Sequence, residues 1–388
     1  MSRSRRRPST IAVRAGLESD PTTRAVVPPL HLSSTFAFRG FNDKGPYDYT
    51  RSGNPTRDLL SSALTELEGG AGAVVTATGM AAITLVGQLL PTGARIVAPH
   101  DCYGGTFRLF QAWRRTGRFA VDFIDYADHT ALARALGTAC DLVWIETPSN
   151  PLLRITDIEQ VVALAHGRGA RAVVDNTFLS PLWQQPLRLG ADLVVHSTTK
   201  YLNGHSDVVG GAVVAATREL SDELAWWANC LGLTGAPFDS YLTLRGLRSL
   251  SARMQVHEKN AVELAQWLGT RREVLKVYYP GLAKHPGHLV ARRQQTGFGA
   301  IITIEIANGA RGAKALVENL RLFSLAESLG GVESLVAHPA TMTHAAMEPE
   351  ARAAAGLVDG LLRLSVGIED VEDLRDDLAT GLDQIRLG

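Results

Sequence analysis

The chain has 388 residues, more than one ordinary hydrophobic core accommodates, so we expect two domains that share an interface. Its 39 basic and 39 acidic residues balance and hydrophobic residues make up 45%, which is typical of a globular protein and argues against a nucleic-acid partner. Cys102, Cys140 and Cys230 are few and widely separated, which supports neither a disulfide framework nor a zinc site.

The N-terminal region begins with a basic leader, SRSRRRPST at residues 2–10, which we interpret as a disordered start rather than a nucleic-acid or targeting tail. No hydrophobic run follows its arginines as in a secretory signal, so we expect a cytoplasmic protein. The following segment is rich in Pro, Gly, Ser and Asn, as in GPYDYTRSGNPTRD, and has little helical periodicity. These features predict an extended arm over residues 1–60.

Residues 69–94 carry no charged side chain, as in a membrane-spanning segment. Gly, Thr, Gln88 and Pro91 interrupt this window, and it lies within a regular alternation of strands and helices. We therefore expect a buried element of a globular domain and no membrane association.

Short β-rich runs alternate with helical patterns between about residues 70 and 216. The runs are apolar continuously rather than at every second residue, as in strands that are buried on both faces. They cover residues 95–99, 119–125, 141–146, 171–175, 191–197 and 210–216. Helical spacing that ends in glycine covers residues 105–117, 129–137 and 157–169. This repeated βαβ pattern predicts an α/β fold with an open, mostly parallel sheet covered by helices.

The pattern changes beyond about residue 250. A helix is predicted around NAVELAQWLG, residues 260–269, and an alternating strand in GAIITIEIANG, residues 299–309. We therefore expect a large domain over residues 61–250 and a smaller α/β domain over residues 251–388.

Ligands bind at the carboxyl ends of the strands in an open parallel sheet. Polar stretches follow the predicted strands there: TGM (78–80), HDCYGG (100–105), ETPSNP (146–151), DNTF (175–178) and HSTTK (196–200). Lys200 ends the last stretch, where partial desolvation makes a lysine amine available for Schiff-base formation, usually with pyridoxal phosphate. That cofactor needs a carboxylate facing its ring nitrogen, and Asp175 lies one strand earlier.

Other residues at the strand ends match the remaining parts of this cofactor. Gly79 and Met80 open a predicted helix whose backbone N–H groups suit a phosphate. Ser197 and Thr199 add hydroxyl donors, and Tyr103 can stack its ring on the pyridine. Each feature alone is more often structural, so the prediction depends on their joint occurrence in one βαβ series.

The histidines near Lys200 do not indicate a metal. His196 and His205 have no third ligand at metal-binding spacing, so we interpret them as structural hydrogen-bonding residues and predict no metal site.

The motifs resemble those of the pyridoxal-phosphate-dependent enzymes of Cys/Met metabolism, the transsulfuration family, over nearly the whole chain. The resemblance is carried by YTRSGNPTRD, GGAGAVVTATGMAAI, APHDCYGG, ETPSNPLL, VVDNTFLSP, HSTTKYLNGHSDVV, FSLAESLGGVESL and LLRLSVGIED. It implies the aspartate aminotransferase-like fold, fold type I, with a mostly parallel seven-stranded sheet, helices on both faces and a smaller C-terminal domain. It also implies amino-acid substrates and a homotetramer, a dimer of dimers with shared active sites.

The same resemblance implies roles around the cofactor. Lys200 matches the lysine that binds pyridoxal phosphate and moves substrate protons, Asp175 the partner of its ring nitrogen, and Tyr103 the stacking tyrosine, which also takes the proton of the substrate amine. The implied phosphate contacts are Gly79, Met80, Ser197 and Thr199, together with Tyr49 and Arg51 from the arm of a neighbouring subunit.

The resemblance also implies the residues that bind the substrate. Arg363 matches the arginine that binds the α-carboxylate, a role suited to its bidentate guanidinium. Asn150 and Ser328 match positions beside the cofactor and that carboxylate. Glu327 and Arg108 match positions near the distal end of the substrate pocket.

Within the family, the stretches IAVRAGL, GFND, ELAWWAN, TGAPFDSYLTLRGLRSL and HPATMTHAAMEPEARAAAG are most similar to bacterial cystathionine γ-synthases. This similarity implies γ-replacement in methionine biosynthesis, in which L-cysteine displaces succinate from O-succinyl-L-homoserine to give L-cystathionine. O-acetyl-L-homoserine is an alternative substrate.

Other activities remain as alternatives. Cystathionine γ-lyases share nearly all the site motifs and release cysteine, 2-oxobutanoate and ammonia. Two further activities are set aside, because family β-lyases usually carry tryptophan where Leu329 stands and methionine γ-lyases usually carry cysteine where Gly105 or Thr106 stands. A non-catalytic regulatory or RNA-binding protein on the same fold is a remote alternative, because Lys200 and Asp175 are both retained.

Overall fold

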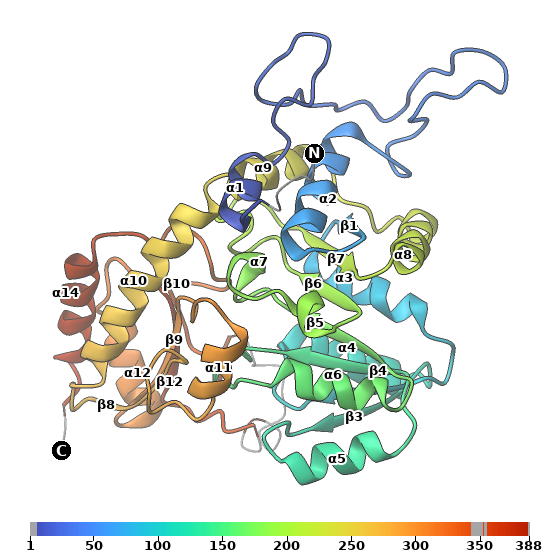
Figure 1. Ribbon diagram of the computed structural model, residues 1–388. Helices are drawn as coiled ribbons and strands as arrows, with labels where there is room; N and C mark the ends of the chain where they lie inside the picture. Colours follow the sequence, from blue (N-terminus) through green and yellow to red (C-terminus); the bar gives the residue numbers. More distant parts are fainter. Residues whose placement is uncertain (1–5, 343–351, 353–354, 387–388) are drawn as a thin grey trace.

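The computed structural model describes residues 6–342, 352 and 355–386, and the structural statements below concern these residues. They form two sheets that are joined by the long helix α10 (Leu250–Leu268) (Figure 1). The large sheet comprises β1 (Gly72–Thr76), β2 (Arg95–Pro99), β3 (Ala120–Ile124), β4 (Leu142–Glu146), β5 (Arg171–Asp175), β6 (Leu193–His196) and β7 (Gly211–Ala215). Each apolar run predicted from the sequence contains one of these strands.

Within the described residues the large sheet has seven strands in the order β1-β7-β6-β5-β4-β2-β3. All run parallel except β7, which is antiparallel to both of its neighbours, β1 and β6. The prediction of a mostly parallel sheet is therefore confirmed. Around it lie α2 (Pro55–Glu68), α3 (Gly79–Val86), α4 (Gly104–Arg115), α5 (His129–Gly137), α6 (Ile158–His166), α7 (Ser180–Trp183), α8 (Arg218–Leu231) and α9 (Pro237–Leu247), with 3-10 turns at Gly87–Leu89 and Pro186–Leu189.

Helices cover both faces of the large sheet, and β4 illustrates why its sequence is apolar throughout. Trp144 packs against Phe110 of α4 on one face, with ring centroids 5.6 Å apart. Val143 packs on the opposite face, in the cluster that contains Leu132 of α5 and Val161 of α6. Because successive side chains of a strand point to opposite faces, both faces need apolar residues.

The second sheet, at the left of Figure 1, lies toward the C-terminus. Its strands are β8 (Val274–Tyr278), β9 (Ile301–Ile306), β10 (Ser324–Leu325), β11 (Leu335–Ala337) and β12 (Leu361–Ser365), and its helices include α11 (His288–Gln294), α12 (Gly309–Val317) and α14 (Val371–Leu382). The sequence predicts alternating apolar and polar residues in β9, but the polar residue Thr303 is buried. Its hydroxyl donates a hydrogen bond to the carbonyl of Pro151 at 2.5 Å. This contact joins the second sheet to the loop that follows β4.

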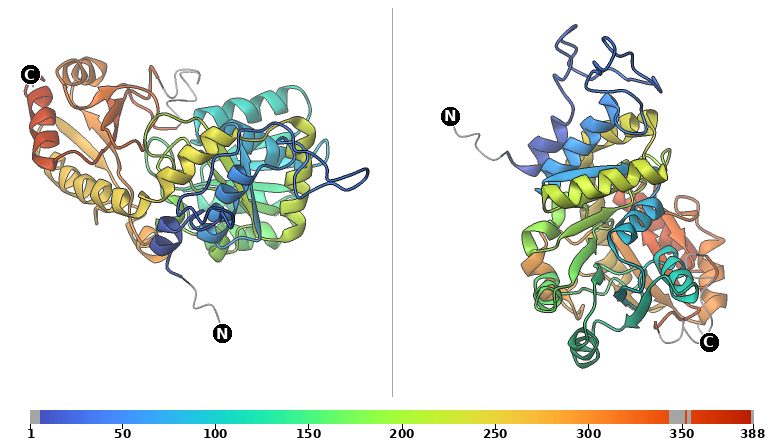
Figure 2. Two further views of the ribbon diagram at one scale, coloured as in Figure 1. Left: turned by 90° about the horizontal axis from the view of Figure 1, so that it is seen from above. Right: turned by 90° about the vertical axis from the view of Figure 1, so that its right-hand side faces the viewer.

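The N-terminal segment differs from the predicted extended arm at its start. Residues Pro8–Val13 form helix α1, and Ile11, Ala12 and Ala15 are buried in the core beside α2 and α10. A short apolar pattern behind a run of arginines therefore forms a packed helix. Beyond it, residues 18–54 lack regular helices or strands, and loops of this segment project from the body of the molecule (Figure 2). The boundaries at residues 60 and 250 remain predictions.

In the part of the chain that the structure describes, none of the helices has the length and apolar character needed to span a membrane. The uncharged window 69–94 contains instead β1, α3 and a 3-10 turn.

Candidate active site

A cavity of about 520 Å³ opens where the carboxyl ends of β4, β5 and β6 face the second sheet. Apart from Tyr49 and Arg51, every residue predicted for the site lines it. These are Gly79, Met80, Tyr103, Arg108, Asn150, Asp175, Ser197, Thr199, Lys200, Glu327, Ser328 and Arg363.

Lys200 lies in the turn that follows β6 and donates a hydrogen bond from Nζ to Oγ of Ser328 at 2.6 Å. Burial, followed by the cation of Arg363, lowers the pKa of Lys200 to about 8, whereas Glu327 acts in the opposite direction. Both causes disfavour the ammonium form. The amine is therefore available as a nucleophile and a base near neutral pH.

Arg363 reaches the same cavity from β12 and is only 3% exposed. Its two terminal nitrogens donate to Oδ1 of Asn150 at 2.8 Å and to the carbonyl of Ser328 at 2.7 Å. Within the described residues, Nε of Arg363 is buried without a hydrogen-bond partner. Burial lowers the pKa of this guanidinium to about 10, and the nearby Glu327 opposes that shift. A buried guanidinium with an unused donor suits an anionic ligand.

Ser328 connects the two cationic side chains through an unusual backbone conformation. Its φ is 86°, in the left-handed region that side chains rarely adopt. Its hydroxyl accepts from Lys200 while its carbonyl accepts from Arg363. Strain of this kind persists where surrounding contacts determine the geometry, and it gathers at functional sites.

Two carboxylates end neighbouring strands below the cavity. Glu146 of β4 and Asp175 of β5 are direct partners in the parallel register. Burial raises the pKa of Asp175, although hydrogen bonds from Thr177 oppose the change. Burial and then the charge of Asp175 raise the pKa of Glu146 well above its usual range. The hydrogen bonds from Thr177 favour the ionised form of Asp175, which a partner of a protonated ring nitrogen needs.

A small concave surface lies at the start of α3. The side chain of Thr78 caps this helix by accepting from the backbone N–H of Ala81 at 2.9 Å. A Cβ added to Gly79 would lie 3.0 Å from Cβ of Ser197, so a larger residue would displace Ser197 by a few tenths of an ångström. Thr199 is fixed beside this surface, because its hydroxyl accepts from the N–H of Gly210 at 3.0 Å. The first N–H groups of α3 and these hydroxyls can bind a phosphate.

Tyr49 and Arg51 lie elsewhere. They line a separate cavity of about 350 Å³ together with residues 234–237 and Asp239. Arg51 donates to the carbonyl of Asn229 at 2.8 Å, and its guanidinium lies 5.6 Å from the centre of the Tyr49 ring. The prediction that both residues serve a neighbouring subunit stays a prediction.

Several residues of the main cavity were not predicted from the sequence, including Glu146, Thr177 and Met342. Glu146 was detectable, because it ends a predicted strand in ETPSNP. Met342 had no such signal, since nothing in the sequence connects residue 342 with strand ends more than 100 residues earlier. Among the described residues, no group of three or more His, Cys, Asp or Glu side chains is arranged to hold a metal.

The family described as Cys/Met metabolism PLP-dependent enzyme matches residues 9–383. The chain belongs to this family. Cystathionine gamma-synthase of Escherichia coli (strain K12) is 56% identical over 377 residues, which are 97% of this chain and 98% of that protein. The solved structure of cystathionine gamma synthase from Xanthomonas oryzae pv. oryzae in complex with cystathionine is 61% identical, with a TM-score of 0.96 and coverage of 97% and 98%.

A relative with another name is also similar. Cystathionine beta-lyase of Coxiella burnetii (strain RSA 493 / Nine Mile phase I) is 44% identical over 375 residues, 96% of this chain and 97% of that protein. Family membership therefore establishes the fold class and the cofactor, while the distinction from β-lyases drawn at Leu329 remains a prediction.

Members of this family use pyridoxal phosphate, and the cavity fits that cofactor. Lys200 has the lowered pKa that suits covalent binding of an aldehyde, and Asp175 offers a carboxylate at the next strand end. The concave surface at Gly79 suits the phosphate. A Cβ on Gly105 would lie 2.4 Å from Cε1 of Tyr103, so glycine leaves the space that the Tyr103 ring occupies at the edge of the cavity.

Proposed function

We propose that the protein catalyses γ-replacement of O-succinyl-L-homoserine by L-cysteine, giving L-cystathionine and succinate in methionine biosynthesis. The observation that carries the proposal is the contact of Lys200 and Arg363 with one residue, Ser328, at 2.6 and 2.7 Å. This contact brings a proton-transferring amine beside an anchor for an α-carboxylate. The relatives named cystathionine gamma-synthase, at 56% and 61% identity, support the choice of reaction.

Lys200 has two roles in this proposal. It would bind the cofactor through its amine, and it would carry protons from Cα and Cβ of the substrate. Its pKa of about 8 suits both roles, because a useful fraction of the amine is unprotonated near neutral pH. When bound, pyridoxal phosphate supplies an electron sink for the negative charge that develops at Cα. Asp175 would keep the ring nitrogen protonated.

The other cavity residues would bind and orient. Arg363 would hold the α-carboxylate with the donor that it leaves unused, while Asn150 fixes the guanidinium. Tyr103 would stack on the cofactor and take the proton of the substrate amine. Glu327 and Arg108 line the cavity and are proposed to contact the distal part of the substrate.

The proposal includes an assembly. The family resemblance predicts a homotetramer in which Tyr49 and Arg51 complete the cofactor site of a neighbouring chain, and we propose that this assembly is cytoplasmic. The exposed arm supports this idea, since it projects from the body of the molecule (Figure 2).

A β-lyase activity is the second candidate, favoured by the Coxiella burnetii relative at 44% identity. The residue at the cavity that argues against it is Leu329, where family β-lyases usually have tryptophan. A γ-lyase activity remains an alternative as well, because the site motifs are shared.

The products of a single preparation distinguish these reactions. The full chain, supplied with pyridoxal phosphate, is assayed with O-succinylhomoserine and cysteine, with the O-acetyl ester in its place, and with cystathionine alone. We expect rapid formation of cystathionine from the succinyl ester and little cleavage of cystathionine. Fast release of 2-oxobutanoate from cystathionine would identify a γ-lyase, and fast release of pyruvate would identify a β-lyase. Either result with negligible synthesis would contradict the proposal.

A further inference from the structure

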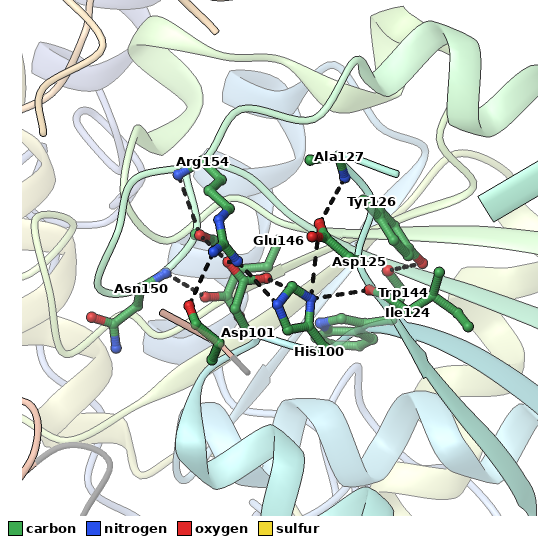
Figure 3. Close-up of polar contacts among 12 residues, drawn as sticks. His100, Asp101, Ile124, Asp125, Tyr126, Ala127, Trp144, Glu146, Asn150 and Arg154 are labelled. Carbon is green, nitrogen blue, oxygen red and sulfur yellow. Dashed lines mark hydrogen bonds and ion pairs between the residues drawn. The ribbon is translucent and has the colours of Figure 1, made fainter. Parts of the chain in front are cut away.

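One buried carboxylate joins two walls of the cavity. Glu146 is 6% exposed, and its Oε2 and Oε1 accept from the backbone N–H groups of Tyr103 at 2.7 Å and Asn150 at 3.1 Å. Figure 3 shows Glu146 beside the loop that carries Asn150. We propose that Glu146 is a positioning residue that fixes both Tyr103 and Asn150. This inference rests on the proposed function, which gives these two residues their roles.

The contact with Tyr103 fixes the start of α4. Tyr103 is the N-terminal cap of this helix, and its side chain does not cap it. The carboxylate of Glu146 accepts from the backbone N–H of this N-cap residue, as the glutamate of a capping box does, and negative charge is favourable at a helix N-terminus. The Tyr103 ring itself occupies the space above Gly105. The position of the ring therefore follows from the backbone that Glu146 holds.

The contact with Asn150 fixes the partner of Arg363. Asn150 holds the guanidinium at 2.8 Å through its side chain while Glu146 holds its backbone. Displacing the Asn150 backbone would therefore move a hydrogen bond of Arg363. Glu146 thus acts on the predicted anchor of the substrate α-carboxylate through one intermediate residue.

A second buried carboxylate holds the far side of the same loop. Asp101 accepts from the Ser149 hydroxyl at 2.7 Å and from the Arg154 guanidinium at 3.0 Å (Figure 3). Arg154 also donates to the carbonyl of Ala355 at 3.0 Å. Asp101 therefore supports the Asn150 loop, and through these hydrogen bonds it does not contact Tyr103, which follows two residues later in the chain.

The position requires a carboxylate rather than an amide. Only a carboxylate accepts at both oxygens, so in Glu146→Gln an NH₂ group would face a backbone N–H and one contact would be lost. Burial and then the charge of Asp175 raise the pKa of Glu146, so ionisation is unfavourable at this place. The backbone N–H groups of Tyr103 and Asn150 act in the opposite direction and favour the carboxylate.

The test compares Glu146→Gln, Asp101→Asn and Asp125→Asn in the full chain with bound pyridoxal phosphate. Asp125 is half exposed, accepts from the N–H of Ala127 and lies 4.0 Å from Nδ1 of His100, at the outer end of this network and away from Glu146, so it serves as the control. The visible circular dichroism of the cofactor reports the Tyr103 stack. Competitive inhibition by norvaline relative to norvalinol, which lacks the α-carboxylate, reports the Asn150 and Arg363 anchor.

We expect Glu146→Gln to change the circular dichroism of the cofactor. We also expect it to raise the inhibition constant of norvaline about tenfold, while the inhibition constant of norvalinol changes less than about twofold. Asp101→Asn should weaken inhibition by norvaline and leave the circular dichroism as it is in the parent protein. Asp125→Asn should change neither. If Glu146→Gln does not fold, Glu146→Asp is measured, which keeps the charge at shorter reach and should still alter at least one of the two signals.

The inference would be overturned by a folded Glu146 variant that keeps the circular dichroism of the parent protein and its ratio of inhibition constants for norvaline and norvalinol. That result is distinguishable from failure of the proposed function. A parent protein that binds no cofactor or forms no cystathionine would overturn the proposed function, whereas an active parent with silent Glu146 variants overturns the positioning role alone.

Discussion

The cavity at the strand ends and the N-terminal arm differ in how far one chain completes them. In the cavity, Lys200 and Arg363 meet at Ser328 although they are far apart in sequence. In the arm, Phe41 is 98% exposed, and Tyr49 and Arg51 line a separate cavity. Groups held by strand ends are preorganised by the fold, whereas the arm presents apolar and cationic groups that the body of its own chain does not cover. The experiments below compare these two regions.

Lys200→Ala has the largest expected effect on the cavity side of this comparison. We expect the rate of cystathionine formation to fall about 10⁴-fold or more, because one change removes both the cofactor anchor and the proton carrier. Steady-state kinetics with saturating pyridoxal phosphate measure the loss. Lys259→Ala, which changes an exposed lysine of α10, should keep parent activity. Normal turnover by Lys200→Ala would contradict the assigned role.

Arg363→Leu tests the second cation of the cavity. Loss of the charge-assisted contacts to the α-carboxylate should lower kcat/KM about 10²-fold, mainly through KM. The change should also raise the pKa of Lys200 above about 8, because the Arg363 cation contributes to lowering it. The pH dependence of chemical labelling of the Lys200 amine in the cofactor-free protein measures this shift. An unchanged KM would rule out Arg363 as the carboxylate anchor.

Lys200 should also reduce the stability of the cofactor-free protein. Its pKa is about 8 when folded against 10.5 for the free side chain, so the folded state binds fewer protons between these values. Stability should therefore rise with pH across this window, and below it the buried ammonium remains unfavourable. Lys200→Met should be more stable at pH 7 by about 2 kcal/mol, a difference that shrinks above pH 8. Urea unfolding at several pH values checks this, and a constant difference would contradict it.

Arg51→Ala has the smallest expected effect and addresses the arm. Activity should fall about tenfold, because one phosphate contact is lost. Mixed assemblies of Arg51→Ala and Lys200→Ala chains should then regain activity, since an intact arm can serve an intact cavity on the neighbouring chain. Mixtures of Lys200→Ala with Arg363→Leu chains, which lack any intact cavity, are the control. No recovery in the first mixture would mean that each arm serves its own chain.

The sequence predicted the large sheet well because its strands are buried on both faces and hence apolar throughout. It did not reveal the reversed direction of β7, since an apolar run such as Gly211–Ala215 reads alike in either orientation. Helix α1 was missed because its few apolar residues follow a run of arginines. Its burial depends on α2 and α10, contacts that no local pattern encodes.

The candidate site was predictable where chemistry coincides with a strand end. Lys200 and Asp175 satisfy that condition, and both line the cavity. Arg363 was placed through the family resemblance alone, because its strand belongs to the second sheet. The role inferred for Glu146 required the three-dimensional structure, since its contacts are with backbone groups of Tyr103 and Asn150.

The most direct test of the account is to treat the full chain with pyridoxal phosphate, reduce it with borohydride and map the modified peptide. The account predicts one labelled lysine, Lys200, and no incorporation in Lys200→Ala at the same protein concentration. A label on another lysine, or none in the parent protein, would contradict the central claim that the cavity at the strand ends is a pyridoxal phosphate site.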